Sequence, residues 1–78
     1  MTKENLLSLI TNASTVVVTL LGKTFNIKGW KNGFYSIEDK NSNSFTIYSS
    51  AQDLIDNYEV MGMPLNQITS WMCVTAVA

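Results

Sequence analysis

Hydrophobic residues return with helical spacing in two segments of the chain. The first is residues 6–13, where leucine and isoleucine recur every three or four positions behind Thr2, a favoured helix N-cap. The second is residues 51–58, whose apolar stripe ends before Gly62 and Pro64, both typical of helix exits. The pattern therefore predicts two helices.

Two overlapping cap signals precede the second predicted helix. Ser49 with Gln52 fits a capping box, in which the hydroxyl and the amide side chains satisfy the first backbone N–H groups. Ser50 with Asp53 is an overlapping and weaker alternative. We expect the Ser49 box to start the helix.

Between the two helices the spacing changes to the alternation of strands. Thr15 to Leu21 is rich in β-branched residues, and Gly22-Lys23 suits a two-residue hairpin turn that begins with glycine. Such a turn places three apolar pairs on one face of the sheet. The pairs are Leu20 with Phe25, Val18 with Ile27 and Val16 with Gly29.

Asn32-Gly33 marks a second hairpin, for which two registers compete. A two-residue turn places charged residues opposite core residues on both faces, whereas a three-residue turn with a left-handed Gly33 does not. We therefore expect the second register. It pairs Trp30 with Phe34, Ile27 with Ile37 and Asn26 with Glu38.

A polar loop separates the third strand from the fourth. If the loop is Lys40 to Ser44, then the inner pairs are Ile37 with Ile47 and Asp39 with Phe45, and Tyr48 lies on the outer face opposite Ser36. Residues 63–78 fit either a helix or a strand, and we expect a strand, lying antiparallel beside the first one. The predicted fold is α+β: one domain over residues 1–78, an antiparallel meander of four to five strands with both helices on one face, in the order α-β-β-β-β-α-β.

The small size of the chain predicts self-association. A chain of 78 residues removes only about 60% of its unfolded surface from water on folding, so its stability is marginal without help. A single cysteine, Cys73, rules out an intrachain disulfide, and its apolar surroundings predict a buried thiol. We expect a homo-oligomer, with the apolar run Trp71 to Ala78 as one candidate contact.

Composition argues against several functional classes. Five lysines, no arginine and a net charge of −1 do not fit a nucleic-acid binder. The absence of histidine removes the usual general base, and no phosphate loop, metal-ligand cluster or carboxylate pair stands out, so we expect neither enzyme nor cofactor. An enzyme of unrecognised type ranks last among the functions considered. No apolar run is long enough to span a membrane, and no secretory signal is evident, which favours the cytoplasm.

The positive signal is a group of aromatic residues on the polar face of the predicted sheet. This candidate site consists of Trp30, Phe34 and Tyr48 beside Lys28 and Glu38. Aromatic anchors with a polar rim are typical of protein-binding hot spots. The structural alternative is that a helix or the C-terminal segment covers these rings.

Two functional hypotheses follow from this site. The first is a non-catalytic binding or inhibitor protein that docks on another protein, and the second is an oligomeric sponge that sequesters a nucleotide-like small molecule, with a ring stacked on an aromatic residue and Lys28 on an anionic group. Lysine without arginine, with abundant asparagine and isoleucine, suggests an AT-rich genome. By association, this favours a phage or mobile-element accessory protein that neutralises a host defence factor.

Overall fold

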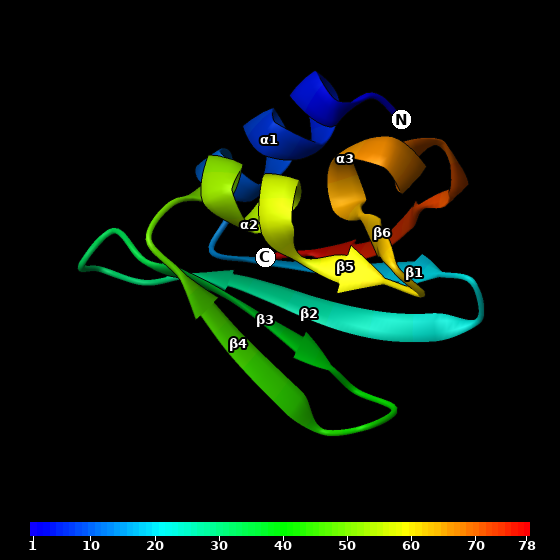
Figure 1. Ribbon diagram of the computed structural model, residues 1–78. Coiled ribbons are helices and arrows are strands. Elements are labelled where there is room, and N and C mark those ends of the chain that lie inside the picture. The colour runs from blue at the N-terminus through cyan, green and yellow to red at the C-terminus, as the bar shows by residue number, and fades with distance from the viewer.

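An antiparallel sheet of five strands organises the computed structural model, which describes residues 1–78 (Figure 1). The elements in chain order are α1 (Lys3–Asn12), β1 (Thr15–Leu20), β2 (Lys23–Gly29), β3 (Tyr35–Asp39), β4 (Ser44–Tyr48), α2 (Ala51–Asn57), β5 (Glu59–Val60), β6 (Met63–Pro64), α3 (Leu65–Ile68), the 3-10 turn η1 (Thr69–Trp71) and β7 (Cys73–Val77). The strand order in the sheet is β4-β3-β2-β1-β7, and β5 pairs with β6 in a separate small hairpin. The predicted α+β meander is confirmed.

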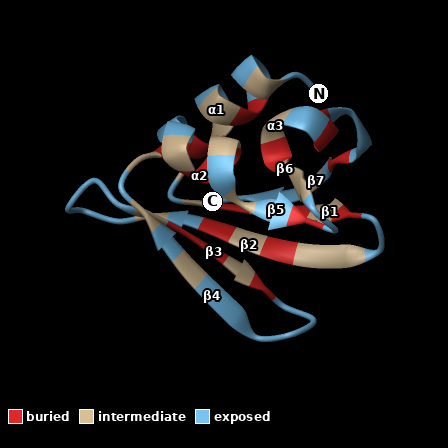
Figure 2. Ribbon diagram, in the orientation of Figure 1, coloured by how far each residue is buried: buried red, intermediate tan, exposed pale blue.

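The helices lie on one face of this sheet, and the core fills the space between them (Figures 1 and 2). From the strands, the core takes Val16, Val18, Leu20, Phe25, Ile27 and Ile37. From the helices and the C-terminal segment, it takes Leu6, Ile10, Ala51, Leu54, Ile55, Val60, Leu65, Ile68 and Met72. The opposite face, which we call the outer face, carries no helix.

Each of the two longer helices begins at a hydroxyl cap. The Thr2 Oγ1 accepts a hydrogen bond of 3.1 Å from the Asn5 N–H, as the sequence predicts. The Ser50 Oγ accepts one of 3.0 Å from the Asp53 N–H, so α2 starts at the alternative that we considered weaker. The Ser49 hydroxyl instead donates to the Asp53 carboxylate over 3.2 Å.

Asp56 joins the three helices through its carboxylate. Its Oδ1 accepts from the Asn66 amide of α3 at 3.0 Å and lies 3.0 Å from the Lys3 ammonium of α1, while its Oδ2 accepts from Gln52 at 2.8 Å. The hydrogen bonds from Asn66, Gln52 and Lys3, of which the one from Asn66 has the largest effect, lower the pKa of Asp56 to about 2.

The central hairpin has the predicted register, with Ile27 opposite Ile37. The Trp30 N–H donates to the Phe34 carbonyl over 2.9 Å, and the Gly33 N–H donates back to the Trp30 carbonyl over 3.0 Å. Gly33 has a φ of 88°, a left-handed conformation that glycine adopts without steric cost. The three-residue turn is confirmed.

The first hairpin closes one residue earlier than predicted. Its turn is Leu21-Gly22, with φ angles of 52° and 77°, and Val18 pairs with Phe25 rather than with Ile27. The pairing partners shift by two residues, and a shift of two leaves every side chain on the same face of the sheet. Val16 and Leu20 therefore still lie in the core. Leu21 bears the steric cost of a left-handed conformation, about 1 to 2 kcal/mol for an L-residue.

The pairing of β3 with β4 corrects the sequence prediction by one residue. Ile37 lies opposite Thr46, and Ser36 lies opposite Ile47. The loop is four residues, Lys40 to Asn43, rather than five. Asn43 adopts a φ of 59°, which asparagine tolerates.

Asp39 explains why the shorter loop forms. Its backbone carbonyl accepts from the Asn43 N–H at 2.8 Å, and its carboxylate accepts from the Asn41 N–H at 2.9 Å. Because a one-residue slip exchanges the faces of a strand, Phe45 and Ile47 point outward and Tyr48 turns inward. The Tyr48 ring then packs edge-on against the Tyr58 ring, with 6.5 Å between ring centroids.

The C-terminal segment combines both alternatives that its pattern allowed. Residues 65–71 are helical and bury Ile68, whereas Cys73–Val77 forms the expected strand antiparallel to β1. Cys73 is exposed, which corrects the prediction of a buried thiol. No helix has both the length and the apolar character needed to cross a membrane.

Candidate functional site

The outer face carries an apolar cluster that the helices leave open to solvent. Trp30 and Phe34 are 43% and 44% exposed, and Phe45 and Ile47 are 54% and 58% exposed. Together with Asn32, these four side chains line a depression of about 290 Å³. We call Trp30, Phe34, Phe45 and Ile47 the outer cluster.

The turn geometry of two hairpins brings the cluster together. The left-handed Gly33 sets Trp30, just after β2, directly opposite Phe34, just before β3. The short loop before β4 sets Phe45 and Ile47 on the same face. Contiguous exposed apolar side chains of this kind mark interaction surfaces more often than isolated ones do.

The structure places most, but not all, of the predicted site residues on the outer face. Trp30, Phe34 and Lys28 lie there as expected, and the alternative, in which a helix or the C-terminal segment covers the rings, does not hold, because both rings are exposed. Tyr48 does not, because the one-residue slip turns it inward against Tyr58. Burial raises the pKa of the Tyr48 hydroxyl.

Phe45 and Ile47 take the place of Tyr48, and the sequence prediction missed both by assigning them to the core. The signal that identifies them is Asn43, since an asparagine in the loop supplies the left-handed residue that a shorter connection requires. Glu38 lies between Asn26 and Phe45 on the outer face, outside both cavities. Its carboxylate lies 3.9 Å from the Lys40 ammonium in an exposed ion pair.

Trp30 is held in place by two polar neighbours. Its indole N–H donates to the Ser36 Oγ over 2.9 Å, and Ser36 itself is buried. The Lys28 ammonium lies 4.2 Å from the centroid of the indole ring, a cation–π contact. The ring is therefore fixed before any partner arrives, which reduces the entropy lost on binding.

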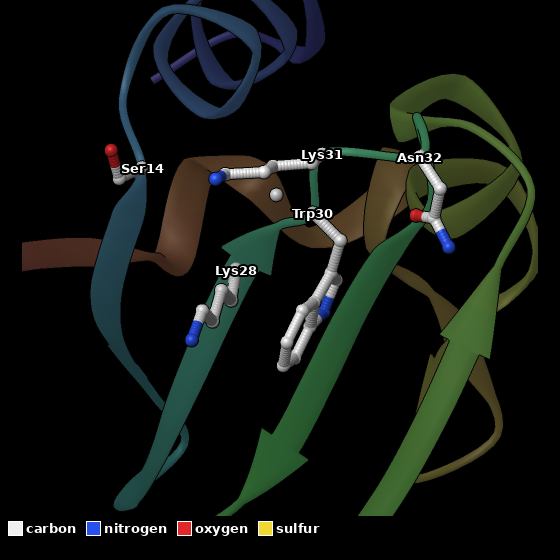
Figure 3. A pocket seen from close by; sticks show the side chains of 6 residues that line it. Ser14, Lys28, Trp30, Lys31 and Asn32 are labelled. Atoms are coloured by element: carbon white, nitrogen blue, oxygen red, sulfur yellow. The ribbon is translucent and has the colours of Figure 1, made fainter.

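A second depression, of about 600 Å³, lies on the other side of Trp30 (Figure 3). It is lined by Ser14, Lys28, Gly29, Trp30, Lys31 and Asn32. Neither Lys28 nor Lys31 has a carboxylate within ion-pair distance, in contrast to Lys3, Lys23 and Lys40. The positive charge of Lys28 and Lys31 is thus available to an anionic group.

The ionisable side chains do not form a metal site. No three side chains of histidine, cysteine, aspartate or glutamate lie close enough together to hold a metal ion. The buried carboxylate, Asp39, pairs with the Lys23 ammonium at 3.7 Å. Burial raises its pKa, but the hydrogen bonds from Asn41 and Ser42 and the charge of Lys23 outweigh burial and lower the pKa overall.

The arrangement thus offers contact surface and positive charge. It brings together a fixed indole, three further exposed apolar side chains and two uncompensated ammonium groups. Comparison of the chain with protein-family models, with curated proteins and with solved structures finds no match.

Proposed function

We propose that this chain is a non-catalytic binding protein whose outer face docks on a partner protein. The observation that carries the proposal is the outer cluster, four large apolar side chains exposed on a sheet face that no helix covers. Tryptophan and other aromatic anchors contribute most of the binding energy at many protein interfaces. Trp30 is already fixed by Ser36 and Lys28, so little ordering is needed when it binds.

The surroundings of the cluster define the partner surface that fits it. The depression between Trp30, Phe34, Phe45 and Ile47 suits an apolar side chain that protrudes from the partner. Lys28 and Lys31 line the neighbouring depression beside Trp30 and lack ion-pair partners, so carboxylates beside the protruding side chain would complement them. The proposed partner is therefore an acidic protein with an apolar protrusion.

The biological role that we attach to docking is inhibition. A small chain without evident catalytic groups acts most simply by blocking the surface of another protein. Its lysine-only basic composition is in keeping with a phage or mobile-element accessory protein directed at a cytoplasmic host defence factor.

Sequestration of a nucleotide-like anion is the second candidate function. It is favoured by the cavity of about 600 Å³ beside Trp30, whose lining includes Lys28 and Lys31 as well as that aromatic residue. One observation weighs against it. A stacking ligand would compete with the Lys28 ammonium for the exposed face of the indole, so docking remains the better supported function.

Comparative affinity capture tests the docking proposal. Phe34→Ser removes an exposed ring of the outer cluster, and Met61→Ser removes an apolar and even more exposed side chain in the turn between β5 and β6. Each variant and the original chain are used to capture proteins from a bacterial extract, which are quantified by mass spectrometry. We expect one acidic protein to be retained by the original chain and by Met61→Ser, but lost with Phe34→Ser. Identical captures by all three baits would refute docking through the outer cluster.

Native mass spectrometry of the purified protein tests the second candidate. A carried anionic ligand would appear as added mass, and Lys31→Ala would reduce its retention by an amount that shrinks as salt concentration rises. Lys40→Ala is the matched control, because Lys40 lines neither cavity and already pairs with Glu38. Added mass that is lost with Lys31→Ala alone would favour sequestration over docking.

A further inference from the structure

Strand β4 forms one edge of the sheet and lacks the features that normally protect such an edge. Its five residues, Ser44–Tyr48, contain no charged residue and no proline, and its pairing with β3 has no bulge. The opposite edge differs, because the pairing of β7 with β1 is interrupted by a bulge between Val17 and Val18. Natural sheets usually protect exposed edges with charges, prolines or bulges, since an unprotected edge invites another strand.

The hydrogen-bonding pattern shows which backbone groups of β4 face this open edge. The Trp30 N–H donates to the Phe34 carbonyl and the Lys40 N–H donates to the Thr24 carbonyl, so even-numbered residues along β3 direct their backbone groups toward β2. Because successive residues of a strand alternate, those of Tyr35, Ile37 and Asp39 point toward β4. Their partners in β4 are Tyr48, Thr46 and Ser44. The N–H and C=O groups of Phe45 and Ile47 therefore point away from the sheet, without partners.

We propose that β4 pairs with β4 of a second copy of this chain, antiparallel and centred on Thr46. In this arrangement Phe45 of each copy lies opposite Ile47 of the other. Each such pair exchanges two N–H···O=C bonds, so every unpartnered backbone group of Phe45 and Ile47 is satisfied. The two Thr46 residues face each other on the two-fold axis as a pair without mutual backbone hydrogen bonds.

The strand is complementary to itself in side chains as well as in backbone. An aromatic residue opposite a β-branched residue is a favourable cross-strand pair, and the proposed register forms two of these on the outer face from Phe45 and Ile47. No charges oppose each other, because β4 carries none. A two-fold contact requires this kind of self-complementary patch, and the strand supplies it.

The pairing would also join the outer clusters of the two copies. Phe45 and Ile47 keep their side chains on the outer face, so the apolar surface would run continuously across the two-fold axis. The inference goes beyond docking and does not rest on it, since edge pairing uses the backbone groups of β4, whereas docking uses side chains on the outer face. A contact made by one five-residue strand is small beside the roughly 1,200 to 2,000 Å² of a stable interface, so we expect a reversible dimer.

Disulfide trapping tests the register. With Cys73→Ser as the background, Thr46→Cys places two thiols on the two-fold axis. The Cα separation in such a pair is about 4.5 Å, within the range of about 4.4 to 6.8 Å that a disulfide requires. Ser44→Cys is the matched control: it is more exposed than Thr46, but faces Tyr48 of the second copy. We expect mild oxidation to cross-link Thr46→Cys and to leave Ser44→Cys monomeric.

Amide hydrogen exchange of the unaltered protein, followed by NMR over a range of concentrations, gives a second measurement that needs no variant. The Phe45 and Ile47 amides should become protected as concentration rises, while the Thr46 amide, already bonded to β3, changes little. Equal cross-linking of both cysteine variants, a monomer at every concentration, or protection that rises on β7 instead would each overturn the proposal.

Discussion

Two isoleucines on neighbouring strands offer a direct test of the register that creates the outer cluster. Ile37 of β3 is 1% exposed, whereas Ile47 of β4 is 58% exposed. The five-residue loop expected from the sequence would have put both in the core. Replacing each one by alanine therefore separates the two registers.

The expected losses differ several-fold. Full burial of an isoleucine stabilises a protein by about 1.5 to 3 kcal/mol, and Ile47 has little more than four-tenths of its surface covered, so Ile47→Ala should cost about 0.6 to 1.3 kcal/mol. Ile37→Ala also leaves a cavity and should cost about 2 to 5 kcal/mol. A domain of 78 residues has a total stability of about 4 to 12 kcal/mol. The second substitution thus removes a large part of it.

Urea denaturation followed by circular dichroism measures both losses. It should be run at low protein concentration, so that association through β4 does not contribute to the stability of the original chain. We expect Ile47→Ala to lower the midpoint slightly and Ile37→Ala to lower it strongly, with similar slopes. Equal losses for the two variants would refute the observed register and remove Phe45 and Ile47 from the outer face.

Three further predictions concern single residues. The folded pKa of Asp56, about 2, lies below the value of about 3.9 in unfolded chains. The carboxylate therefore stabilises the fold above about pH 4, and this stabilisation is lost as the pH falls toward 2. Asp56→Asn should make the melting temperature less dependent on pH over that range, and an unchanged pH dependence would contradict this role. Leu21→Asn should raise the free energy of unfolding by roughly 1 kcal/mol, because asparagine adopts the left-handed conformation more readily, and a lower urea midpoint would contradict it. Ser50→Ala should lower the free energy of unfolding by about 0.5 to 2 kcal/mol, because Ser50 caps α2. Ser49→Ala should lower it less, and the reverse order in urea denaturation would favour the Ser49 capping box instead.

Patterns of side chains predicted the layers of the fold better than they predicted the register of its strands. The core positions of β1, β2 and β3 followed from alternation, because an error of two residues at Leu21-Gly22 leaves every side chain on its own face. An error of one residue at the loop between β3 and β4 had the opposite effect. It placed Ile47 in the core and Tyr48 outside, the reverse of the structure.

The physical reason is that hydrophobicity alone favoured the wrong register. Burying Phe45 and Ile47 satisfies an apolar pattern, whereas the structure closes a shorter loop with hydrogen bonds around Asp39 and a left-handed Asn43. The two halves of the outer cluster differ for the same reason in how well the sequence predicted them. Trp30 and Phe34 follow from a glycine turn with a strong sequence signature, while Phe45 and Ile47 depend on a loop with a weak one.

The C-terminal segment fits two spacings for a different physical reason. Its apolar residues fit both spacings because both structures are present, with helical turns through Trp71 and a strand from Cys73. Met72 ends the helical part and is buried, whereas Cys73 on the edge strand is exposed. Short elements of this kind leave too few residues for either period to dominate.

Two tryptophans allow the most direct measurement of the central claim, that the outer face is the binding surface. Trp30 belongs to the outer cluster, and Trp71 is similarly exposed but lies in η1, away from that cluster. The affinity of each alanine variant for the captured partner can be measured by isothermal titration calorimetry. Docking through the outer face predicts that Trp30→Ala weakens the affinity at least about 10-fold, or ~1.4 kcal/mol, while Trp71→Ala leaves it unchanged. Loss of affinity with Trp71→Ala, and none with Trp30→Ala, would contradict the claim.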